Sequence, residues 1–482
     1  MDLGTTAGIQ SAGPLNNYAL ANYFTHGADL NVNLSGNLDM FSTSISSYNG
    51  GAVNVNVAGN ANIGSTSFAG NDQVARGIFS VQKSDVNVIT GGDININGSR
   101  IAAYDGGNLT VESLDGNIDA GTGGRGSVTV EEVYVDPITR QVLTHAAVIP
   151  GSGILATTFP QPFSGSGFPA SKNTVGNILV ETPNGNVLAS EGGIVQLPLN
   201  GVNSPNAIVQ VLAGYELRDP NGNRLTASSL VTDDLVQGSL AAATPGDLPR
   251  TVVLDKQRIQ VSTAVWSELN SLLGLSPGSG QVIDLNASAN QSGLTAYLLG
   301  TSSSLTGFSF QTQTTTGQNI NASGSGVIGS NVKLDATGNI IGVIFARNNL
   351  DLAAKNNVNV TALAQGNVNA NAGGTISGTL VGIGGVNASG SSIDASLLSQ
   401  NVTASGDTSG AKEGFAQGTA ANSTSQGLSN DSTTAVTKSS GTDDDDALKK
   451  KKTIGLAQKV GRVTVILPVK KLSEKATGND PL

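Results

Sequence analysis

The chain has no cysteine, few aromatic residues and few charges. In its 482 residues Cys is absent, aromatic residues make up 4% and charged residues 12%. Without Cys, neither disulfide bonds nor cysteine-ligated metal can hold the fold together, so stability must come from backbone hydrogen bonds and aliphatic packing. The scarcity of aromatic residues argues against the thick core of an ordinary globular protein and favours a thin, long one.

The chain also lacks the marks of nucleic-acid and membrane proteins. Its formal net charge is -10 and it has no basic stripe to neutralise phosphates, which argues against a nucleic-acid partner. No apolar run has the length of a membrane-spanning helix, so no transmembrane segment is expected. The start Met1-Asp2-Leu3-Gly4 has no signal-peptide pattern, and we expect the natural N-terminus to lie upstream.

What the chain has in abundance is Gly, with 63 residues, beside Asn, Ser, Thr and small aliphatics. Between Gly338 and Ser377 a turn residue repeatedly precedes a short run that alternates aliphatic with polar residues, which is typical of a strand with one buried face. The first aliphatic residue of alternate units recurs every 18 positions: Ile340 to Val358, Leu350 to Val368, Val358 to Ile376, and Val368 to Val386. Units too short to bury a core alone must stack on one another.

The repeats therefore predict an all-β fold, a single-stranded, right-handed parallel β-helix of roughly ten coils that is on the order of 50 Å long. Gly-Asn pairs precede many of these strands, for example at Gly116-Asn117 and Gly185-Asn186. Gly would supply the sharp turn, and Asn residues at equivalent corners would form a hydrogen-bonded ladder. This predicts a structural role for the Gly-Asn pairs.

Changes of pattern along the chain predict its organisation. Residues 131–170 contain five prolines and are predicted to be an insertion. Residues 198–318 are predicted to be a second, larger insertion that contains one amphipathic helix at 263–273 around Trp266. If the protein has a specific binding surface, the larger insertion is the first place to look for it. In the loosely patterned part after 64, Phe68, Ile78, Phe79 and Val81 are expected inside the coils. The segments are an N-terminal cap or fragment edge with weak helical spacing (1–26), coils (27–130), an insertion (131–170), coils (171–197), an insertion (198–318), coils (319–405), a disordered low-complexity linker (406–452), and a C-terminal strand within 460–468 and tail (453–482).

No catalytic, cofactor-binding or metal-ligating residue is assigned. His26 and His145 stand without neighbours at metal-ligand spacing. Parallel β-helices also include polysaccharide lyases and hydrolases, which need paired carboxylates in one groove, and Asp105, Asp115 and Asp119 are the candidates, with Asp233 and Asp234 in the larger insertion. An enzyme of that class is the alternative to a non-catalytic adhesive rod.

The Gly-Asn-aliphatic coils from about 27 to 405, their insertions and the charged tail resemble filamentous-haemagglutinin-like large exoproteins. The resemblance implies a secreted or cell-surface adhesin, a repeat protein exported by two-partner secretion or as an autotransporter. Expected partners are an outer-membrane secretion protein and glycans or proteins on host or neighbouring cells. The family's Asn-Pro-Asn-Gly turn is echoed at Thr182-Pro183-Asn184-Gly185 and Asp219-Pro220-Asn221-Gly222, which are read as ordinary turns.

Overall fold

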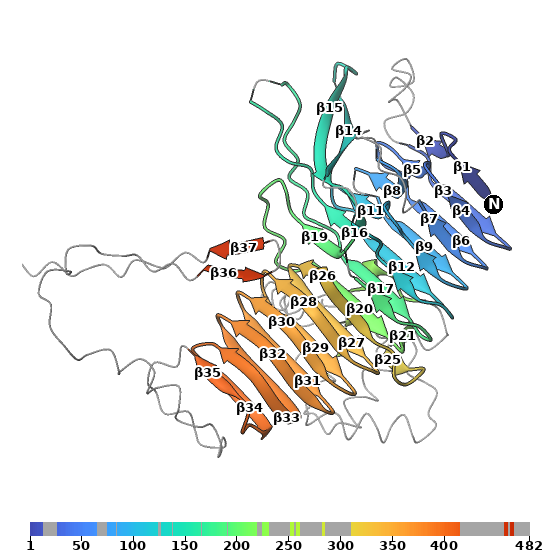
Figure 1. Ribbon diagram of the computed structural model, residues 1–482. Coiled ribbons are helices and arrows are strands. Elements are labelled where there is room, and N and C mark those ends of the chain that lie inside the picture. The colour runs from blue at the N-terminus through green and yellow to red at the C-terminus, as the bar shows by residue number, and fades with distance from the viewer. Residues whose placement is uncertain are drawn as a thin grey trace, which may run out of the picture. The chain divides into compact units, whose positions relative to one another are not determined.

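The computed structural model describes most of the coils and short parts of the remainder. The described residues are 1–12, 27–64, 75–82, 84–123, 127–136, 138–164, 166–189, 191–218, 224–230, 251–254, 257–260, 282–284, 310–414, 457–460 and 463–466. A 28-stranded sheet winds through the compact unit Met1–Ser429, and the pairings between its successive coils are parallel. The predicted parallel β-helix is confirmed, while its handedness stays a prediction. Figure 1 shows the coils stacked in chain order from β1 to β35.

Each coil has three faces, and each face is a column of strands. The first face consists of β1 (Asp2–Gly4), β4 (Leu38–Met40), β7 (Ala61–Ile63), β10 (Ile94–Asn95), β13 (Ile118–Asp119), β18 (Val187–Leu188) and the first parts of β26 (Ile320–Gly329), β28 (Ile340–Ala346), β30 (Val358–Ala364) and β32 (Thr375–Gly382). The second consists of β2 (Ile9–Ser11), β5 (Ser44–Ser47), β8 (Gly77–Val81), β11 (Arg100–Tyr104), β16 (Gly153–Thr157), β19 (Ile194–Leu197), the later parts of β26, β28, β30 and β32, and β35 (Lys412–Gly414).

The third face consists of β3 (Leu30–Leu34), β6 (Val53–Val57), β9 (Val86–Thr90), β12 (Leu109–Ser113), β17 (Ile178–Thr182), β20 (Ile208–Ala213), β27 (Asn331–Ala336), β29 (Leu350–Ala354), β31 (Asn367–Ala372), the start of β33 (Gly385–Leu398) and β34 (Val402–Asp407). The later part of β33 returns to the first two faces, where it pairs with β32. Eleven strands succeed one another on the first face, from β1 to β33, and at the spacing of about 4.8 Å they span about 50 Å. This agrees with the predicted length.

The repeat of 18 residues is the register of the coils. Ile340 pairs with Val358, Leu350 with Val368, Val358 with Ile376, and Val368 with Val386, as the spacing predicts. The inward residues of all three faces form one continuous core of Val, Ile, Leu and Ala. Ile78 belongs to this core, and so do Val386, Ile393 and Leu397 in the last coils. The thin, aliphatic interior follows from the alternation of residues in each strand.

A ladder of side chains runs along one corner of the coils. The side-chain oxygen of Asn186 accepts the backbone N–H of Asn319 at 2.8 Å, and that of Asn319 accepts the backbone N–H of Asn339 at 2.8 Å. The same bond recurs between successive members of the series Asn37, Asn60, Asp93, Asn117, Asn186, Asn319, Asn339, Asn357 and Thr375. The predicted corner ladder is confirmed, and the bond that recurs at every step of this series is one to a backbone N–H.

An antiparallel hairpin covers the outside of the second face in the earlier coils. It consists of β14 (Ser127–Val135) and β15 (Val142–Pro150), and its Val128 and Ile149 belong to an outer apolar cluster with Phe79 and Leu155. The prediction that Phe79 and Val81 point into the coils is therefore wrong, because both belong to this outer cluster. Phe68 lies outside the described residues. Rings of Tyr48, Phe79, Tyr104 and Phe159 follow one another in this layer at 5.7, 5.9 and 6.3 Å.

The apolar column beneath the hairpin continues into the later coils. Leu155 is in register with Val195, and from there the column runs through Ile328, Phe345, Leu363, Val381 and Leu398, one residue in each coil. These last five side chains are half-buried. The outward positions of the third face in the same coils carry Asp and Asn instead, for example Asp351, Asn369 and Asn387. The second face is therefore the apolar side of this part of the rod.

Several predicted boundaries are wrong. β1 and β2 pair with β4 and β5, so the coils begin at Asp2 and not after a cap over 1–26, whose proposed helix lies outside the described residues. The insertions predicted at 131–170 and 198–318 include β16 and β20, yet both are strands of the large sheet. Conversely, Val128 and Val130 of the predicted coil belong to the hairpin. Alternation alone does not distinguish a strand inside the coil from one packed on its outside.

The coils extend past the predicted end at 405, because β35 pairs with β33. A second unit spans Asn430–Leu482. In it the predicted single strand is a pair of antiparallel strands, β36 (Ala457–Val460) and β37 (Val463–Ile466). The rest of the predicted linker and tail, like the helix 263–273, lies outside the described residues.

Replacing Asn339 by Ala should lower the free energy of unfolding by about 2 kcal/mol. The Asn339 side chain donates to Asn319 in the coil before it and accepts from the backbone and side-chain N–H groups of Asn357 in the coil after it, and Ala removes all of these hydrogen bonds. Urea denaturation followed by circular dichroism measures the change. Asn359→Ala is the matched control, since Asn359 is an exposed outward residue of the neighbouring coil, and it should change stability by less than about 0.5 kcal/mol. Equal losses in both variants would contradict a special role of the corner.

Candidate binding surface

The larger insertion leaves the coils after β20, and its first described residues lie over the outside of the third face. Its first strand, β21 (Tyr215–Arg218), pairs with the last, β25 (Phe310–Gln313), and it also contains the 3-10 turn η2 (Ala227–Ser229) and a small sheet of β22 (Thr251–Leu254), β23 (Gln257–Gln260) and β24 (Val282–Asp284). Leu217, Ala227 and Leu230 form an apolar cluster with the outward residues Leu179 and Leu212. The start of the insertion is thus seated on β17 and β20.

Backbone groups of the insertion bond to the coils. The backbone N–H of Ala227 donates to Thr110 Oγ1 at 2.9 Å. The Asn177 side chain, at a corner of the coil, donates to the carbonyls of Ala227 and Leu230 at 3.1 and 3.0 Å. Because these are bonds to specific backbone atoms, they fix the position of η2 on the third face as well as its attachment.

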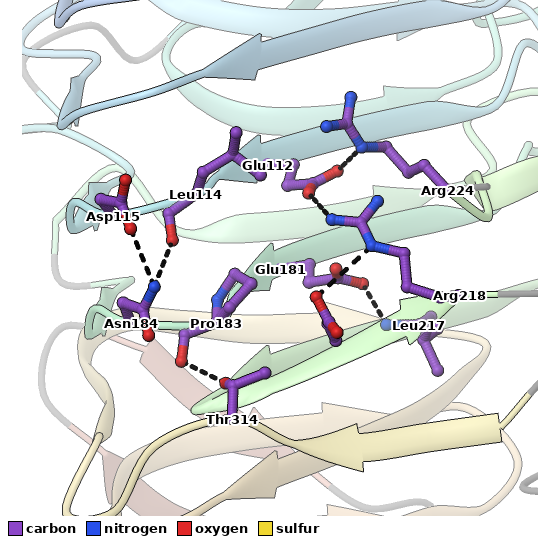
Figure 2. A network of polar contacts seen from close by, with 11 residues as sticks. Glu112, Leu114, Asp115, Glu181, Pro183, Asn184, Leu217, Arg218, Arg224 and Thr314 are labelled. Atoms are coloured by element: carbon purple, nitrogen blue, oxygen red, sulfur yellow. Dashed lines mark hydrogen bonds and ion pairs between the residues drawn. The ribbon is translucent and has the colours of Figure 1, made fainter. Parts of the chain in front are cut away.

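A buried ion-pair cluster lies beside this contact (Figure 2). Glu112 and Glu181 are outward residues in register on the adjacent strands β12 and β17, and each is 1% exposed. Arg218 Nη2 donates to Glu112 Oε1 at 2.9 Å, and Arg224 Nε contacts the other carboxylate oxygen. Arg218 Nε also lies 3.4 Å from Glu216. The two arginines of the insertion therefore share one carboxylate of the coils.

The two buried carboxyl groups have different surroundings. Glu181 accepts only the backbone N–H of Leu217, at 3.1 Å on Oε2, and its Oε1 has no hydrogen-bond partner in the described part of the chain. Burial, followed by the neighbouring charge of Glu112, raises the pKa of Glu181 well above its ordinary value. Burial also raises the pKa of Glu112, but Arg224 and Arg218 oppose that shift. The two arginines therefore favour the charged form of Glu112, whereas Glu181 has no such partner and its surroundings favour the protonated form.

Chemically, this arrangement suits an anchor for the insertion. Paired carboxyl groups with separated pKa values are a feature of glycoside hydrolysis, but there they meet a polymer in an open groove. Glu112 and Glu181 lie under the insertion, with 1% of each residue exposed. Breaking a buried ion pair on one side is costly, so the cluster holds the insertion in one position.

The insertion returns to the coils at a turn that the sequence had marked. Thr315 Oγ1 donates to the Pro183 carbonyl at 2.7 Å, and Thr314 bonds the same oxygen. Within the turn, Thr182 Oγ1 donates to the Gly116 carbonyl at 2.7 Å and Asn184 Nδ2 to Asp115 at 2.9 Å. The segment Thr182 to Gly185 is therefore a corner that receives the returning chain (Figure 2).

The structure does not bring the predicted carboxylates together. Asp105 follows β11 on the second face, Asp115 follows β12 on the third, and Asp119 lies in β13 on the first. Each is engaged locally: Asp105 accepts Ser171 Oγ at 2.6 Å, Asp115 accepts Asn184, and Asp119 accepts the Gly121 backbone N–H at 2.9 Å. Asp233, Asp234 and His26 lie outside the described residues.

His145 does have an acidic partner, which the sequence reading missed because the two residues are 13 apart and meet across the hairpin. Its Nδ1 lies 2.7 Å from Glu132 Oε2. Burial, and less strongly the charge of Asp105, raises the pKa of Glu132 to about 8, and burial lowers that of His145. Both shifts favour the uncharged form of the group concerned. Among the described residues, no three His, Asp or Glu side chains form a metal-ligand group.

Comparison with family models, curated proteins and solved structures finds no match to this chain. In the parts that the structure describes, no helix has the length and apolarity that crossing a bilayer requires.

One signal of the anchoring cluster was present in the sequence. Most outward positions of the third face carry Asn, Asp, Ser or Thr, but Leu109-Thr110-Val111-Glu112 and Ile178-Leu179-Val180-Glu181 both end in Glu. Two glutamates at the same position of adjacent coils would repel each other, so they indicate that basic partners from another segment lie over these strands. Their partners Arg218 and Arg224 are distant in sequence, so spacing did not reveal the pairing.

Replacing Glu181 by Gln should stabilise the protein at pH 8 and leave it unchanged at pH 4. In the unfolded chain the Glu181 carboxyl group loses its proton above its ordinary pKa of 4.5, whereas the folded protein keeps that proton up to the raised pKa. The contribution of Glu181 to the free energy of unfolding therefore falls as pH rises from 4.5 toward the raised pKa. Gln removes that loss. Urea midpoints at pH 4, 6 and 8 test it, with the exposed Glu191→Gln as control. A variant whose midpoint stays parallel to wild type across this range would show that Glu181 is ionised in the folded state.

Proposed function

We propose that this protein is a non-catalytic structural adhesin, secreted or held at the cell surface, whose rod presents its flanks to glycans or proteins of another cell. The observation that carries the proposal is the uninterrupted stack of coils with an insertion anchored on its side by buried polar contacts. Because each coil stacks on its neighbours, such a scaffold is elongated and can present an extended surface to another cell.

The chemistry of the surface supports contact rather than turnover. Outward positions carry Asn rows, such as Asn31, Asn54 and Asn87, which offer many weak donors and acceptors. The neighbouring carboxyl groups Glu112 and Glu181 are buried beneath the start of the larger insertion. Export through an outer-membrane partner, by two-partner secretion or an autotransporter route, belongs to the same proposal and rests on the resemblance of the coils to filamentous-haemagglutinin-like exoproteins.

Beads coated with the purified chain should bind cells saturably, and free folded chain should compete with them. Beads coated with the heat-unfolded chain are the matched control, because composition and charge are equal and only the fold is lost. Binding that is the same for both coats, or absent for both across a panel of cell types, would contradict adhesion.

Two further arms examine the same proposal. Labelling intact producing cells with a membrane-impermeant reagent should modify the protein, and a wholly internal pool would count against surface display. Incubation with uronic-acid polymers should give no new reducing or unsaturated ends. Reproducible turnover would replace the adhesin by the polysaccharide-degrading alternative.

A further inference from the structure

A groove runs along the third face in the earliest coils and ends at Arg224. It has a volume of about 660 Å³, and its lining includes Asn33, Asn56, Ile89, Leu114 and Arg224. Asn33, Asn56 and Ile89 are outward residues in register on β3, β6 and β9, and the next residue of that column is Glu112. The groove therefore follows one column of side chains until the insertion blocks it.

The column of asparagines is interrupted inside the groove. Asn56 Nδ2 donates to Asn33 Oδ1 at 2.9 Å, which leaves the Asn33 amide N–H groups and the Asn56 carbonyl oxygen without partners among the described residues. In the neighbouring column the ladder goes on, because Asn87 Nδ2 donates to Asn54 Oδ1 at 2.9 Å. Ile89 stands where a third Asn would continue the first ladder. The groove thus offers unused amide groups and then an aliphatic surface.

Arg224 closes the groove with a pre-oriented cation. Its Nε contacts the buried carboxylate of Glu112, and Figure 2 shows the contact to Glu112 starting at Nε, with none drawn from the two Nη groups. Neither Nη group has a partner among the described residues, and the side chain is 26% exposed. Arg224 is the one charged residue of the groove lining. A planar guanidinium fixed through Nε presents its Nη groups as donors that suit a carboxylate.

Two of the three strands beneath the groove, β6 and β9, cannot recruit a partner strand. β6 and β9 are paired on both edges, with β3 and β9 and with β6 and β12 respectively, so their backbone groups are already bonded. Peptides that bind by strand addition need a free edge. Over β6 and β9 a ligand is therefore recognised by side chains: the amide group of Asn56, the aliphatic surface of Ile89 and the guanidinium of Arg224.

From this geometry we infer that the groove binds a carboxylated oligosaccharide, with its carboxylate on Arg224, the apolar face of a sugar ring on Ile89 and hydroxyl groups on Asn56 and Asn33. The inference rests on the proposed adhesive function and names the ligand class and the site. The groove holds only one cation, so binding should weaken as salt screens it.

Calorimetric titration of the full chain with uronate oligosaccharides is the test, with size-matched neutral and sulfated oligosaccharides beside them. Uronates should bind best. Arg224→Gln should lower their affinity at least tenfold, and Arg224→Lys should recover it only in part, because the ammonium lacks the planar fork. Arg347→Gln, at an exposed position elsewhere on the coils, should bind as wild type does.

Because Arg224 also neutralises Glu112, a second variant leaves the ion pair intact. Ile89→Asn would extend the ladder from Asn56 and remove the aliphatic surface, so it should lower uronate affinity about fivefold in a folded protein. Wild-type affinity in both Arg224→Gln and Ile89→Asn would overturn the site, and equal binding of neutral sugars or of an acidic peptide would overturn the ligand class. Cell adhesion that persists in both variants, without any uronate binding by wild type, would overturn the groove and leave the adhesin intact.

Discussion

Hydrogen bonding between one coil and the next is the constraint on which the rest of this structure depends. A coil is too small to satisfy its own backbone, so almost every strand must pair with the coil before and the coil after it. This requirement places equivalent residues above one another and brings the corners into close contact. A Cβ atom at Gly185 would lie 1.9 Å from the Gly116 carbonyl oxygen, so that corner has room only for glycine. The Asn ladder then adds side-chain bonds along the same axis.

The same constraint decides where the chain can depart from the rod. The hairpin β14–β15 leaves between β13 and β16, and the larger insertion leaves after β20 and returns before β26, so both begin and end between strands of the stack. Where they fold back, they bury outward residues that would otherwise face water. The hairpin does this with aliphatic side chains, and the larger insertion adds the Glu112 ion pairs. A charged anchor costs desolvation but accepts only one geometry, which suits an element that must be held in place.

Sequence periodicity predicted the fold, the 18-residue register and the corner ladder, because each is a local rule repeated many times. It did not separate strands of the coil from strands packed on it: Val128 and Val130 alternate as a coil strand would, and β20 has apolar residues on both sides. The buried contacts Glu112 to Arg218 and Glu132 to His145 were also missed, since each joins elements whose meeting is set by an insertion's path. Sites made by repetition are visible in a sequence, whereas sites made by an interruption of the repetition require the structure.

The absence of cysteine allows a direct measurement of the stacking. Asn359 and Ser377 are register partners on adjacent coils, while Asp394 lies one coil further on. At about 4.8 Å between adjacent strands, the double variant Asn359→Cys with Ser377→Cys meets the distance a disulfide needs, and Asn359→Cys with Asp394→Cys, at about twice that spacing, does not. Mild oxidation should cross-link the first pair within one chain and leave the second reduced. Efficient cross-linking of the second pair, or none of the first, would contradict coils stacked at a repeat of 18 residues.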